Sequence, residues 1–596
     1  MDKKALLAKY IEERDKRLRN DGSAQYQRLE GKFEHYAVDP HTPRVEREAI
    51  TDHVTFAFVG GGFAGLLAGA RLKERGIEDV RIIEKGGDFG GAWYWNRYPG
   101  AQCDTASMVY MPMLEETGHM PTEKYAHGPE ILGQCQRIGR QYDLYGKALF
   151  HTIVTGAEWD DENDRWTITT DRDDRFTASF IGLGTGPLHV PKLPGIPGIE
   201  DFEGHSFHTS RWDYGYTGGD PEGAPLDRLA DKRVAIIGTG ATSVQVVPHL
   251  ARSAGRLYVV QRTPSSIDAR NNEPIDPDWF EEIAEEGWQQ KWLENFTDNS
   301  FGGAAEEDLV QDGWTDISRR IRARLAEIPR GQIDQGSILA AYEDCDFEKM
   351  EEIRARTQSI VQDKETAEKL KAWYRQMCKR PCFHDDYLPA FNVDTVELVH
   401  TDGKGVERIT AKGFVVDCKE HEVDCIIYAS GFVVSLDNKV RAGFDLTGRG
   451  GLKLSEAWGG GMRTLHGVHS HGFPNCFFVQ PTQGANLISN VPHNLTEIGH
   501  TIAAVVSTAL DRGIDVVEVT KTAQDDWIDL LLSGSARMAR SPDCTPGYYN
   551  NEGQDAGPAA AFAVGYPQGP SAYFRYLKQW RARGDFEGLA FDGETL

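Results

Sequence analysis

The stretch Val-Thr-Phe-Ala-Phe-Val-Gly-Gly-Gly-Phe-Ala-Gly, residues 54–65, decides the fold class. Its first six residues are apolar, β-branched or aromatic, which is typical of a buried strand. Gly60, Gly62 and Gly65 follow at once, and Leu66–Arg75 has the composition of a helix. A tight glycine turn between a strand and a helix lets backbone N–H groups and the helix N-terminus face a pyrophosphate. The stretch therefore predicts the first part of a dinucleotide-binding βαβ unit.

The order of strand, glycine turn, helix and strand occurs twice. The first unit closes with the short apolar run Val80–Ile83, and the second consists of Arg233–Ile237, Gly238–Ser243, a helix and Leu257–Val260. A lone glycine motif is weak evidence in a chain with 63 Gly, because composition alone produces chance matches. The strand before each turn and the helix after it make both motifs specific, although Ser243 replaces the third glycine of the second turn.

The residue that ends each second strand distinguishes the two nucleotides. Glu84 stands where a carboxylate accepts hydrogen bonds from a ribose 2′-hydroxyl, which suits FAD or NAD and repels a 2′-phosphate. Arg262 stands at the matching place of the second unit, where a guanidinium pairs with a 2′-phosphate. The alternative for Arg262 is a solvated charge at the end of a strand. The two residues predict FAD or NAD in the first unit and NADPH in the second.

Composition disfavours several classes of protein. The 596 residues carry 65 Lys and Arg against 91 Asp and Glu, a formal charge of −26, which disfavours a nucleic-acid or anionic-membrane partner. No apolar run has the length of a membrane span, the charged N-terminus lacks the pattern of a signal peptide, and Thr501–Leu510 has the length of a buried helix. The nine Cys are scattered and odd in number, which favours reduced thiols and a cytoplasmic location.

The order of the motifs predicts an α/β fold with two dinucleotide-binding, Rossmann-like domains, a helical insertion and an N-terminal helical extension. The insertion is rich in Glu, Arg, Gln and Trp and has few strand signals. Two apolar strands, Phe180–Gly186 and Ile426–Gly431, end in small residues and are expected where the chain crosses between domains. The predicted ranges are 1–50 for the extension, 51–187 and 425–596 for the FAD-binding domain with the C-terminal region, 188–270 and 373–424 for the NADPH-binding domain, and 271–372 for the insertion.

The segment Gly90–Asp104 separates two classes of protein that bind both nucleotides. Disulfide reductases place a redox Cys pair after their first unit, whereas this segment has Cys103 alone. The segment resembles instead the second signature of type I Baeyer–Villiger monooxygenases. The matching residues are Gly91, Trp93, Tyr98, Pro99, Gly100 and Asp104.

The main fingerprint of the same family, F-x-G-x-x-x-H-x-x-x-W followed by Pro or Asp, is complete here. Its residues are Phe202, Gly204, His208, Trp212 and Asp213. The resemblance extends from about residue 51 to about residue 560. Residues 1–50 look like the extension of members that accept larger ketones, and Cys544–Gly553 is similar to a segment of those members. We interpret His208 as a domain-linking residue rather than a proton-transfer group.

The resemblance implies FAD and NADPH as cofactors, and a ketone and O2 that react through a flavin C4a-peroxide to an ester or lactone. Arg380, between Lys379 and Pro381, matches the family's catalytic arginine, and Asp104 would orient it. Read without the family, Lys379 and Arg380 would be two surface charges. Motif and resemblance together give as flavin contacts Gly60, Gly62, Gly65, Glu84, Ala92, Trp93, Tyr94, Trp95, Gln102, Cys103, Asp104 and Tyr110. The NADPH and active-site contacts are Thr239, Gly240, Ala241, Thr242, Ser243, Val244, Gln245, Arg262, Thr263, Lys379 and Arg380.

Two other functions share the nucleotide units. A flavin monooxygenase that oxidises amines or sulfides has both, and a dinucleotide-sensing protein would have them without activity. Arg380 with Asp104 and the complete fingerprint favour the ketone enzyme. The pattern departs from the family at Ser430, where Thr is common, and no tryptophan of the nicotinamide loop can be placed between Trp527 and Trp580. The His and Cys spacings predict no metal site, and the oligomeric state stays open, a monomer included.

Cys378 and Cys382 flank the proposed active-site cation. Their three-residue spacer differs from the Cys-x-x-Cys redox motif, and the chemistry of the family uses no thiol. We therefore expect no redox role for this pair.

Overall fold

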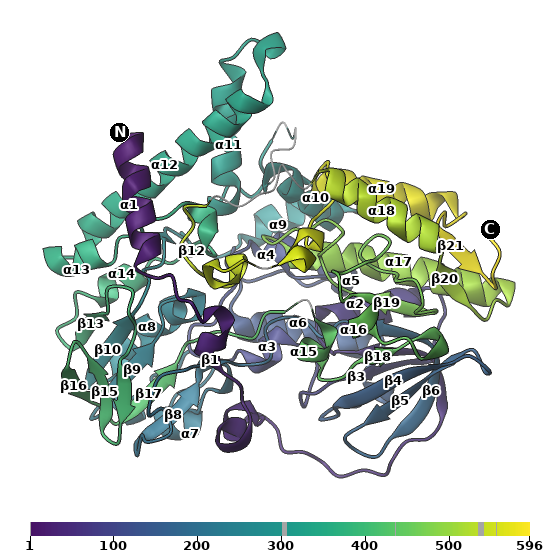
Figure 1. Ribbon diagram of the computed structural model, residues 1–596, viewed down its shortest axis with the longest axis horizontal. Helices are drawn as coiled ribbons and strands as arrows, with labels where there is room; N and C mark the ends of the chain where they lie inside the picture. Colours follow the sequence, from purple (N-terminus) through teal and green to yellow (C-terminus); the bar gives the residue numbers. More distant parts are fainter. Residues whose placement is uncertain are drawn as a thin grey trace.

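The computed structural model describes residues 2–300, 305, 307–435, 437–534, 542–555 and 557–595. Its two large sheets lie in opposite halves of the molecule, each with helices against it, and a pair of long helices projects from the top of Figure 1. This is the α/β architecture with two Rossmann-like domains that the two glycine motifs predict. No helix in these ranges is long and apolar enough to cross a membrane.

The first sheet carries the first glycine turn. Its seven strands follow the order β18-β4-β5-β6-β2-β3, with β19 beside β6. β2 runs parallel to both β3 and β6, whereas β4 and β5 form an antiparallel extension beside β6. The strands predicted at 54–59 and 80–83 are confirmed, and the one predicted at 180–186 is the end of β6. The bounds are β2 His53–Val59, β3 Val80–Ile83, β4 Val154–Asp160, β5 Arg165–Thr170, β6 Arg175–Leu183, β18 Leu446–Thr447 and β19 Cys476–Phe478.

Two helices cover this sheet near the glycine turn. α2 (Phe63–Glu74) follows the turn directly and packs against α17 (Val491–Arg512). The predicted buried helix at 501–510 is part of α17, and its Ile502, Val505 and Val506 are fully buried. Burial of each such side chain contributes roughly 1.5–3 kcal/mol, so this contact fixes α2 and the turn that precedes it.

The second sheet is parallel throughout and carries the second glycine turn. Its order is β13-β10-β9-β17-β8, and α8 (Ala241–Ser253) follows the turn. The domain boundary predicted at residue 425 falls before β17, which pairs with β9, so the chain leaves this sheet only after Tyr428. β17 remains part of the second sheet because all four of its residues are buried there. The bounds are β8 His205–His208, β9 Arg233–Ile237, β10 Arg256–Gln261, β13 Val396–His400 and β17 Cys425–Tyr428.

The insertion between β10 and β13 is helical, as its composition predicts, apart from residues 301–304 and 306, which lie outside the described ranges. Asp312 and Asp334 cap the two helices that form the projecting pair, α11 and α12, because each side chain accepts from backbone N–H groups of the first turn. The helices are α9 Pro277–Ile283, α10 Trp288–Ser300, α11 Gly313–Ala326, α12 Gln335–Ile360 and α13 Lys364–Lys369.

The N-terminal extension is helical only in part. α1 (Lys3–Asp15) lies beside α12 in Figure 1, and the ring of Tyr10 packs edge-on against Phe347 of that helix. After two short 3-10 turns, residues 38–52 form neither helix nor strand, so the helical part of the extension ends before the predicted boundary at residue 50. Pro40 and Pro43 explain the difference, since proline lacks the N–H that a helix needs.

The other strands and helices connect or cover the two sheets. The strands are β1 Tyr26–Gln27, β7 Leu193–Pro194, β11 Ile267–Asp268, β12 Cys382–Phe383, β14 Arg408–Thr410, β15 Gly413–Val416, β16 Lys419–Glu422, β20 Val517–Val519 and β21 Leu589–Phe591. The helices are α3 Ala92–Trp95, α4 Ser107–Tyr110, α5 Leu114–Thr117, α6 Gly128–Gln141, α7 Tyr214–Thr217, α14 Tyr387–Ala390, α15 Asn438–Ala442, α16 Leu454–Ala457, α18 Lys521–Ser533 and α19 Pro570–Arg583.

Candidate active site

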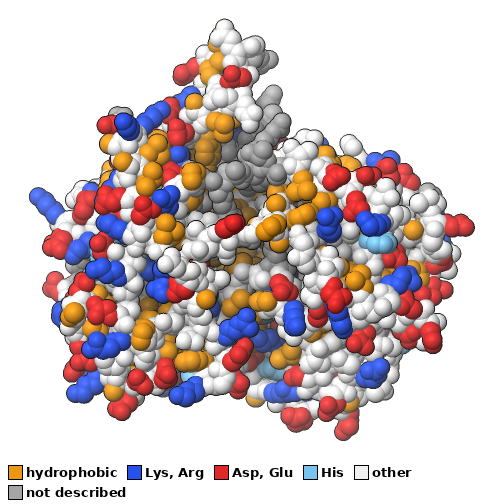
Figure 2. All heavy atoms as spheres, in the orientation of Figure 1, with side chains coloured by type: hydrophobic (Ala, Val, Ile, Leu, Met, Phe, Trp, Pro, Cys, Tyr) orange, Lys and Arg blue, Asp and Glu red, His pale blue; other side chains and the backbone are white. Residues whose placement is uncertain are grey.

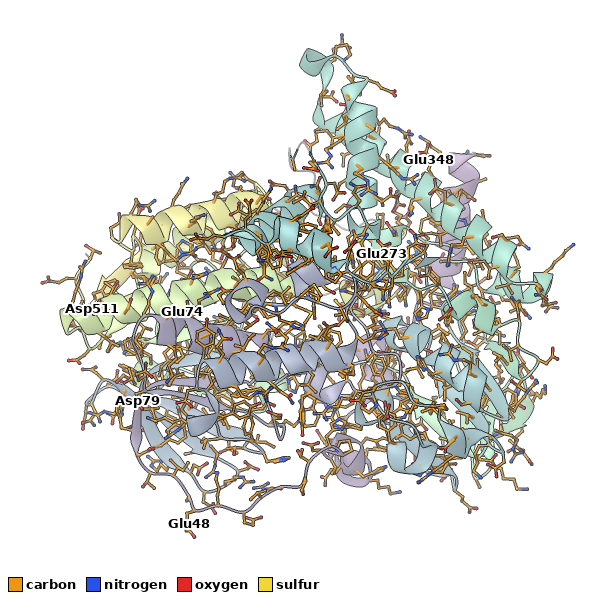
Figure 3. All side chains as sticks on the ribbon, turned by 180° about the vertical axis from the view of Figure 1, so that it is seen from behind. Glu48, Glu74, Asp79, Glu273, Glu348 and Asp511 are labelled. Atoms are coloured by element: carbon orange, nitrogen blue, oxygen red, sulfur yellow. A yellow bond between two sulfur atoms is a disulfide. The ribbon has the colours of Figure 1, made fainter. Side chains whose placement is uncertain are left out.

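One large cavity joins the two glycine turns. Its volume is about 1150 Å³, and residues from both sheets, the N-terminal extension and the C-terminal segment line it. Figure 2 shows the surface hollowed between the two halves of the molecule. The acidic side chains labelled in Figure 3 come instead from elements spread along the chain, Glu48, Glu74, Asp79, Glu273, Glu348 and Asp511. The negative net charge is thus distributed, while several cations gather at the cavity.

Most of the residues predicted for the site line this cavity. They are Gly60, Gly62, Glu84, Ala92, Trp93, Trp95, Gln102, Cys103, Asp104, Tyr110, Thr239, Gly240, Ala241, Thr242, Gln245, Arg262, Thr263, Lys379 and Arg380. Four predicted residues do not line it, namely Gly65, Tyr94, Ser243 and Val244. Tyr94 points away because its hydroxyl donates to Asp39 at 2.6 Å in the N-terminal extension.

The glycine turns are shaped for a phosphate group. A Cβ on Gly65 would lie 2.1 Å from the carbonyl oxygen of Gly60, so this glycine allows α2 to approach the turn. A Cβ on Gly240 would meet nothing within 4 Å, because that position faces the cavity. Close packing behind the first turn and open space in front of the second fit a pyrophosphate at each helix N-terminus. The residues present therefore fit two dinucleotides.

Glu84 is held by the backbone of its own unit. Its Oε2 accepts from Gly61 N at 2.5 Å and its Oε1 from Gly86 N at 2.6 Å. Burial raises the pKa of Glu84, while these two hydrogen bonds act in the opposite direction. A carboxylate has about four acceptor positions, so it can still accept from a ribose hydroxyl at the cavity wall.

Gln245 joins the two units. Gln245 belongs to α8 of the second unit. Its Oε1 accepts a hydrogen bond from Tyr98 OH at 2.9 Å, and its Nε2 donates to the Gln102 carbonyl at 2.7 Å. Both partners follow the first glycine turn along the chain. The two nucleotide sites are therefore fixed relative to each other by side chains that both line the cavity.

Arg380 and Asp104 meet at the junction of the two units. Nε of Arg380 donates to Oδ2 of Asp104 at 3.0 Å, and Nη2 donates to Oδ1 at 2.6 Å. The guanidinium also lies over the ring of Trp314, 5.1 Å from its centroid. Burial opposes the charge, but the pairing with Asp104 holds the pKa of Arg380 well above its usual range. The cation is thus permanently charged and fixed in orientation.

Several residues of this site give no local signal in the sequence. Trp314 comes from α11 in the insertion, and its Nε1 donates to the Asp104 carbonyl at 2.9 Å. Arg270 is buried and donates to the side chain of Gln102. Tyr548 of the C-terminal segment lines the same cavity. Each of them reaches the site through tertiary packing.

The cations at the second unit surround one carboxylate. Arg262 donates to the side chain of Gln25, and its Nη2 lies 3.9 Å from Oε2 of Glu552. Lys192 Nζ lies 3.8 Å from Oε1 of the same Glu552. Lys379 lines the cavity close by, and burial together with repulsion by Arg262 lowers its pKa to about 8. Of these residues, sequence reasoning found only Arg262 and Lys379.

The expectation that the thiols are reduced was wrong for two cysteines. Cys378, next to Lys379, forms a disulfide with Cys544 of the C-terminal segment, whereas the other seven cysteines are free. Cys378 and Cys382 do not pair with each other, and burial raises the pKa of Cys382 to about 11, which leaves that thiol neutral. Scattered positions gave no signal of this pairing, because the fold brings the two cysteines together.

The fingerprint histidine is buried at the end of β8. Nδ1 of His208 lies 2.8 Å from Ser210 Oγ, and Nε2 lies 3.1 Å from the carbonyl of Gly431, just after β17. Burial lowers its pKa to about 3, so the ring is neutral. Its place agrees with a link between β8 and the crossing segment. Within the described ranges, no group of three or more His, Cys, Asp or Glu side chains could hold a metal ion.

Matches with known proteins extend over nearly the whole chain. Residues 57–300 match the family described as pyridine nucleotide-disulphide oxidoreductase. Over 595 residues the chain is 48% identical to neopentalenolactone D synthase from Streptomyces avermitilis, with 99% of each protein covered. It is 47% identical over 592 residues to a Baeyer-Villiger monooxygenase from Streptomyces coelicolor, which covers 98% of this chain and 96% of that protein.

Solved structures agree. The polycyclic ketone monooxygenase from the thermophilic fungus Thermothelomyces thermophila superposes with a TM-score of 0.92 at 39% identity, over 98% of both chains. Similar structures at 26% identity include a complex with both FAD and NADP.

Proposed function

The chain belongs to the type I Baeyer–Villiger monooxygenases, and we propose that it oxidises a bulky polycyclic ketone at the Arg380–Asp104 pair. It uses FAD and NADPH to insert one oxygen atom of O2 next to a ketone carbonyl, giving an ester or a lactone. The polycyclic substrate is supported by two similar proteins, whose names specify neopentalenolactone D and a polycyclic ketone. The observation that carries the site is the bidentate cation in a cavity shared by both glycine turns.

FAD, when bound and reduced by NADPH, supplies the oxygen activation that side chains cannot provide. The protein contributes a fixed charge. Nε and Nη2 of Arg380 donate hydrogen bonds to Asp104, whereas Nη1 has no protein acceptor in the described part of the chain. Nη1 can therefore donate to a carbonyl oxygen as negative charge develops there. A preorganised donor of this kind contributes roughly 3–4 kcal/mol to the stability of a transition state.

Orientation of the guanidinium is the role we assign to Asp104 and Trp314. The carboxylate fixes the plane of Arg380 through two hydrogen bonds, and the indole supports one face of it. An ammonium group at this position would lack the planar fork that Asp104 binds. Cys103 beside Asp104 takes no part in proton transfer, because burial raises its pKa to about 12.

At the second unit, we assign the 2′-phosphate of NADPH to Arg262 and Lys379 and its pyrophosphate to the turn at Thr239 and Gly240. Thr239 Oγ1 donates to the Thr263 carbonyl at 2.7 Å, which fixes the end of β10 against the turn. Both cations line the cavity and lack a short carboxylate partner in the described ranges. They are thus free to bind a phosphate.

We also propose a cytoplasmic location and the six predicted ranges as domains, with the NADPH-binding domain extended through Tyr428. Seven of the nine cysteines are free and six of these are buried, which supports a protein that folds with reduced thiols. The disulfide between Cys378 and Cys544 is then a local link added to an otherwise reduced chain.

The experiment that tests this function replaces Arg380 with Ala in the FAD-loaded enzyme. Ester formation from a polycyclic ketone should fall about 10²–10³-fold, because the carbonyl loses its charged donor. Flavin reduction by NADPH without oxygen should persist, and Arg380→Lys should restore little. The matched control is Arg408→Ala, which removes an exposed arginine of β14.

Product yield per NADPH consumed and the anaerobic reduction rate are the two measurements. Ester formation at near wild-type yield in Arg380→Ala would refute the catalytic assignment. Oxidation of an amine or sulfide in preference to every ketone of a small, macrocyclic and polycyclic panel would refute the proposed substrate class.

A further inference from the structure

Glu552 lies among the cations that the proposed function assigns to the 2′-phosphate. Its side chain is 6% exposed, and Lys192 and Arg262 lie at 3.8 and 3.9 Å from its two oxygens. In the described part of the chain no other carboxylate lies within 4.0 Å of either cation. Tyr26 OH donates to Oε1 at 3.2 Å, and Lys192 Nζ lies 3.6 Å from the centre of the Tyr26 ring.

These contacts are too long to be the optimum for either cation. A charge-assisted N–H to carboxylate hydrogen bond has a length of about 2.7–2.9 Å, shorter than both ion-pair distances by an ångström. Oε2 of Glu552 is buried and accepts no hydrogen bond from the residues that the structure describes. The hydrogen bond from Tyr26 to Oε1 thus compensates only part of this buried charge, and the carboxylate is a loose partner for the two cations.

The cations outnumber the negative charge at this place. Lys192, Arg262 and Lys379 all line the cavity, and in the described ranges Glu552 is the one carboxylate within 4.0 Å of Lys192 or Arg262. Burial lowers the pKa of Lys192, Glu552 raises it, and Arg262 lowers it further. The pKa of Lys379 responds to its burial and to the same two neighbours in the same directions. A group with more charge and more acceptor atoms than one carboxylate would therefore be better matched to this site.

We propose that Glu552 occupies the 2′-phosphate position of the nucleotide-free enzyme and that the 2′-phosphate of NADP(H) displaces it. The proposal rests on the assignment of Arg262 and Lys379 above. A phosphate monoester carries close to two negative charges and three acceptor oxygens, so it can make short contacts with several cations at once. Glu552 then weakens NADPH binding by competing for those cations and leaves NADH binding unchanged.

The exchange also connects the nucleotide to the C-terminal segment. Glu552 lies eight residues after Cys544, whose disulfide to Cys378 fixes the start of this segment beside Lys379. The displaced side chain can move while the segment stays attached.

The test compares Glu552→Gln with the wild type in the oxidised, FAD-loaded enzyme. Glutamine keeps the size of the side chain and the acceptor for Tyr26, and it removes the charge. NADP+ should bind about tenfold more tightly to the variant, whereas NAD+ binding should stay the same. The matched control is Asp555→Asn, which removes one exposed charge from the same segment and should change neither affinity.

The same binding measurement can be made with adenosine 2′,5′-bisphosphate and 5′-ADP, which both lack the nicotinamide. The first carries the 2′-phosphate and should bind more tightly to Glu552→Gln, and the second should not. Unchanged or weaker NADP+ binding by a Glu552→Gln variant that retains FAD would refute the proposed displacement of Glu552. An equal gain in affinity for NADP+ and NAD+, or for the bisphosphate and 5′-ADP, would refute it as well. A wild type that does not distinguish the bisphosphate from 5′-ADP would overturn the assignment of Arg262 and Lys379 as well.

Discussion

The two dinucleotide-binding units share one order of elements but fix their nucleotide-recognising residue in different ways. In the first unit, backbone N–H groups of Gly61 and Gly86 bind Glu84, and all three residues belong to the same βαβ unit. In the second, Arg262 contacts Gln25 of the N-terminal extension and Glu552 of the C-terminal segment. Glu84 is thus held within its own unit, whereas Arg262 is held by residues near both ends of the chain.

The difference suits the two nucleotides. A site built from adjacent backbone groups is as stable as the fold of its unit, which suits a cofactor that stays bound. A site built from side chains of distant, partly exposed segments can open locally at lower cost, because fewer buried contacts are lost. NADPH must enter and leave in each catalytic cycle, so the second design suits a nucleotide that exchanges.

The largest expected effect in a test of this comparison is the loss of stability and of FAD when Gly65 of the first turn is replaced with Ala. Gly65→Ala places a Cβ 2.1 Å from the Gly60 carbonyl oxygen, and we expect a loss of about 3 kcal/mol or more together with loss of FAD. Gly240→Ala in the second unit meets open space and should keep both fold and flavin. FAD content and thermal unfolding measure the two effects. A Gly65→Ala enzyme with full flavin would contradict the rigid first site.

Local pattern was sufficient for the parts of the fold that are continuous in sequence. The strand and glycine turn at 54–65 and the helix after them follow one another along the chain, so hydrophobic pattern and turn chemistry predicted them. The same holds for Arg233–Ile237 in the second unit and for the end of its second strand, where Arg262 follows β10. Arg380 was placed through the family motif around it.

The parts that pattern did not predict depend on distant segments. Glu552 lies in the segment Cys544–Gly553, whose resemblance to the family assigned it no role, and Lys192 has no motif near it; the fold of the C-terminal segment brings Glu552 to both Arg262 and Lys192. Trp314 reaches Asp104 from the insertion. Tyr94 lies in the segment that resembles the family signature, and its hydroxyl donates to Asp39 of the extension, a contact that this segment alone does not indicate. Such contacts follow from tertiary packing, which a single sequence does not display.

A smaller effect tests the second unit directly. Arg262→Ala should raise the Michaelis constant for NADPH about tenfold or more and leave that for NADH nearly unchanged, since only NADPH carries the 2′-phosphate. Gln25→Ala, which removes the remote partner of Arg262, should reproduce part of this effect without loss of FAD. Steady-state kinetics with both nucleotides measure it. Equal effects on the two nucleotides would remove the 2′-phosphate assignment.

The smallest effect is a pH dependence of NADPH binding that comes from Lys379. Its burial lowers its pKa to about 8, and repulsion by Arg262 and Arg17 acts in the same direction, while Glu552 and Cys382 oppose it. Lys379 is therefore charged below pH 8 and neutral above it, whereas Arg262 stays charged throughout. Attraction for the 2′-phosphate is complete at the lower pH and decreases as the pH rises through about 8.

We therefore expect the ratio of the Michaelis constants for NADPH and NADH to increase about two- to threefold from below to above pH 8, the scale of one partly screened charge. NADH lacks the 2′-phosphate and serves as the internal reference at each pH. Lys379→Arg should abolish the dependence, because a guanidinium remains protonated over the whole range. A ratio that changes equally in the wild type and in Lys379→Arg would assign the titration to another group. A constant ratio in the wild type would show that the 2′-phosphate does not interact with Lys379, and the second site would then depend on Arg262 and its partners from the two chain ends.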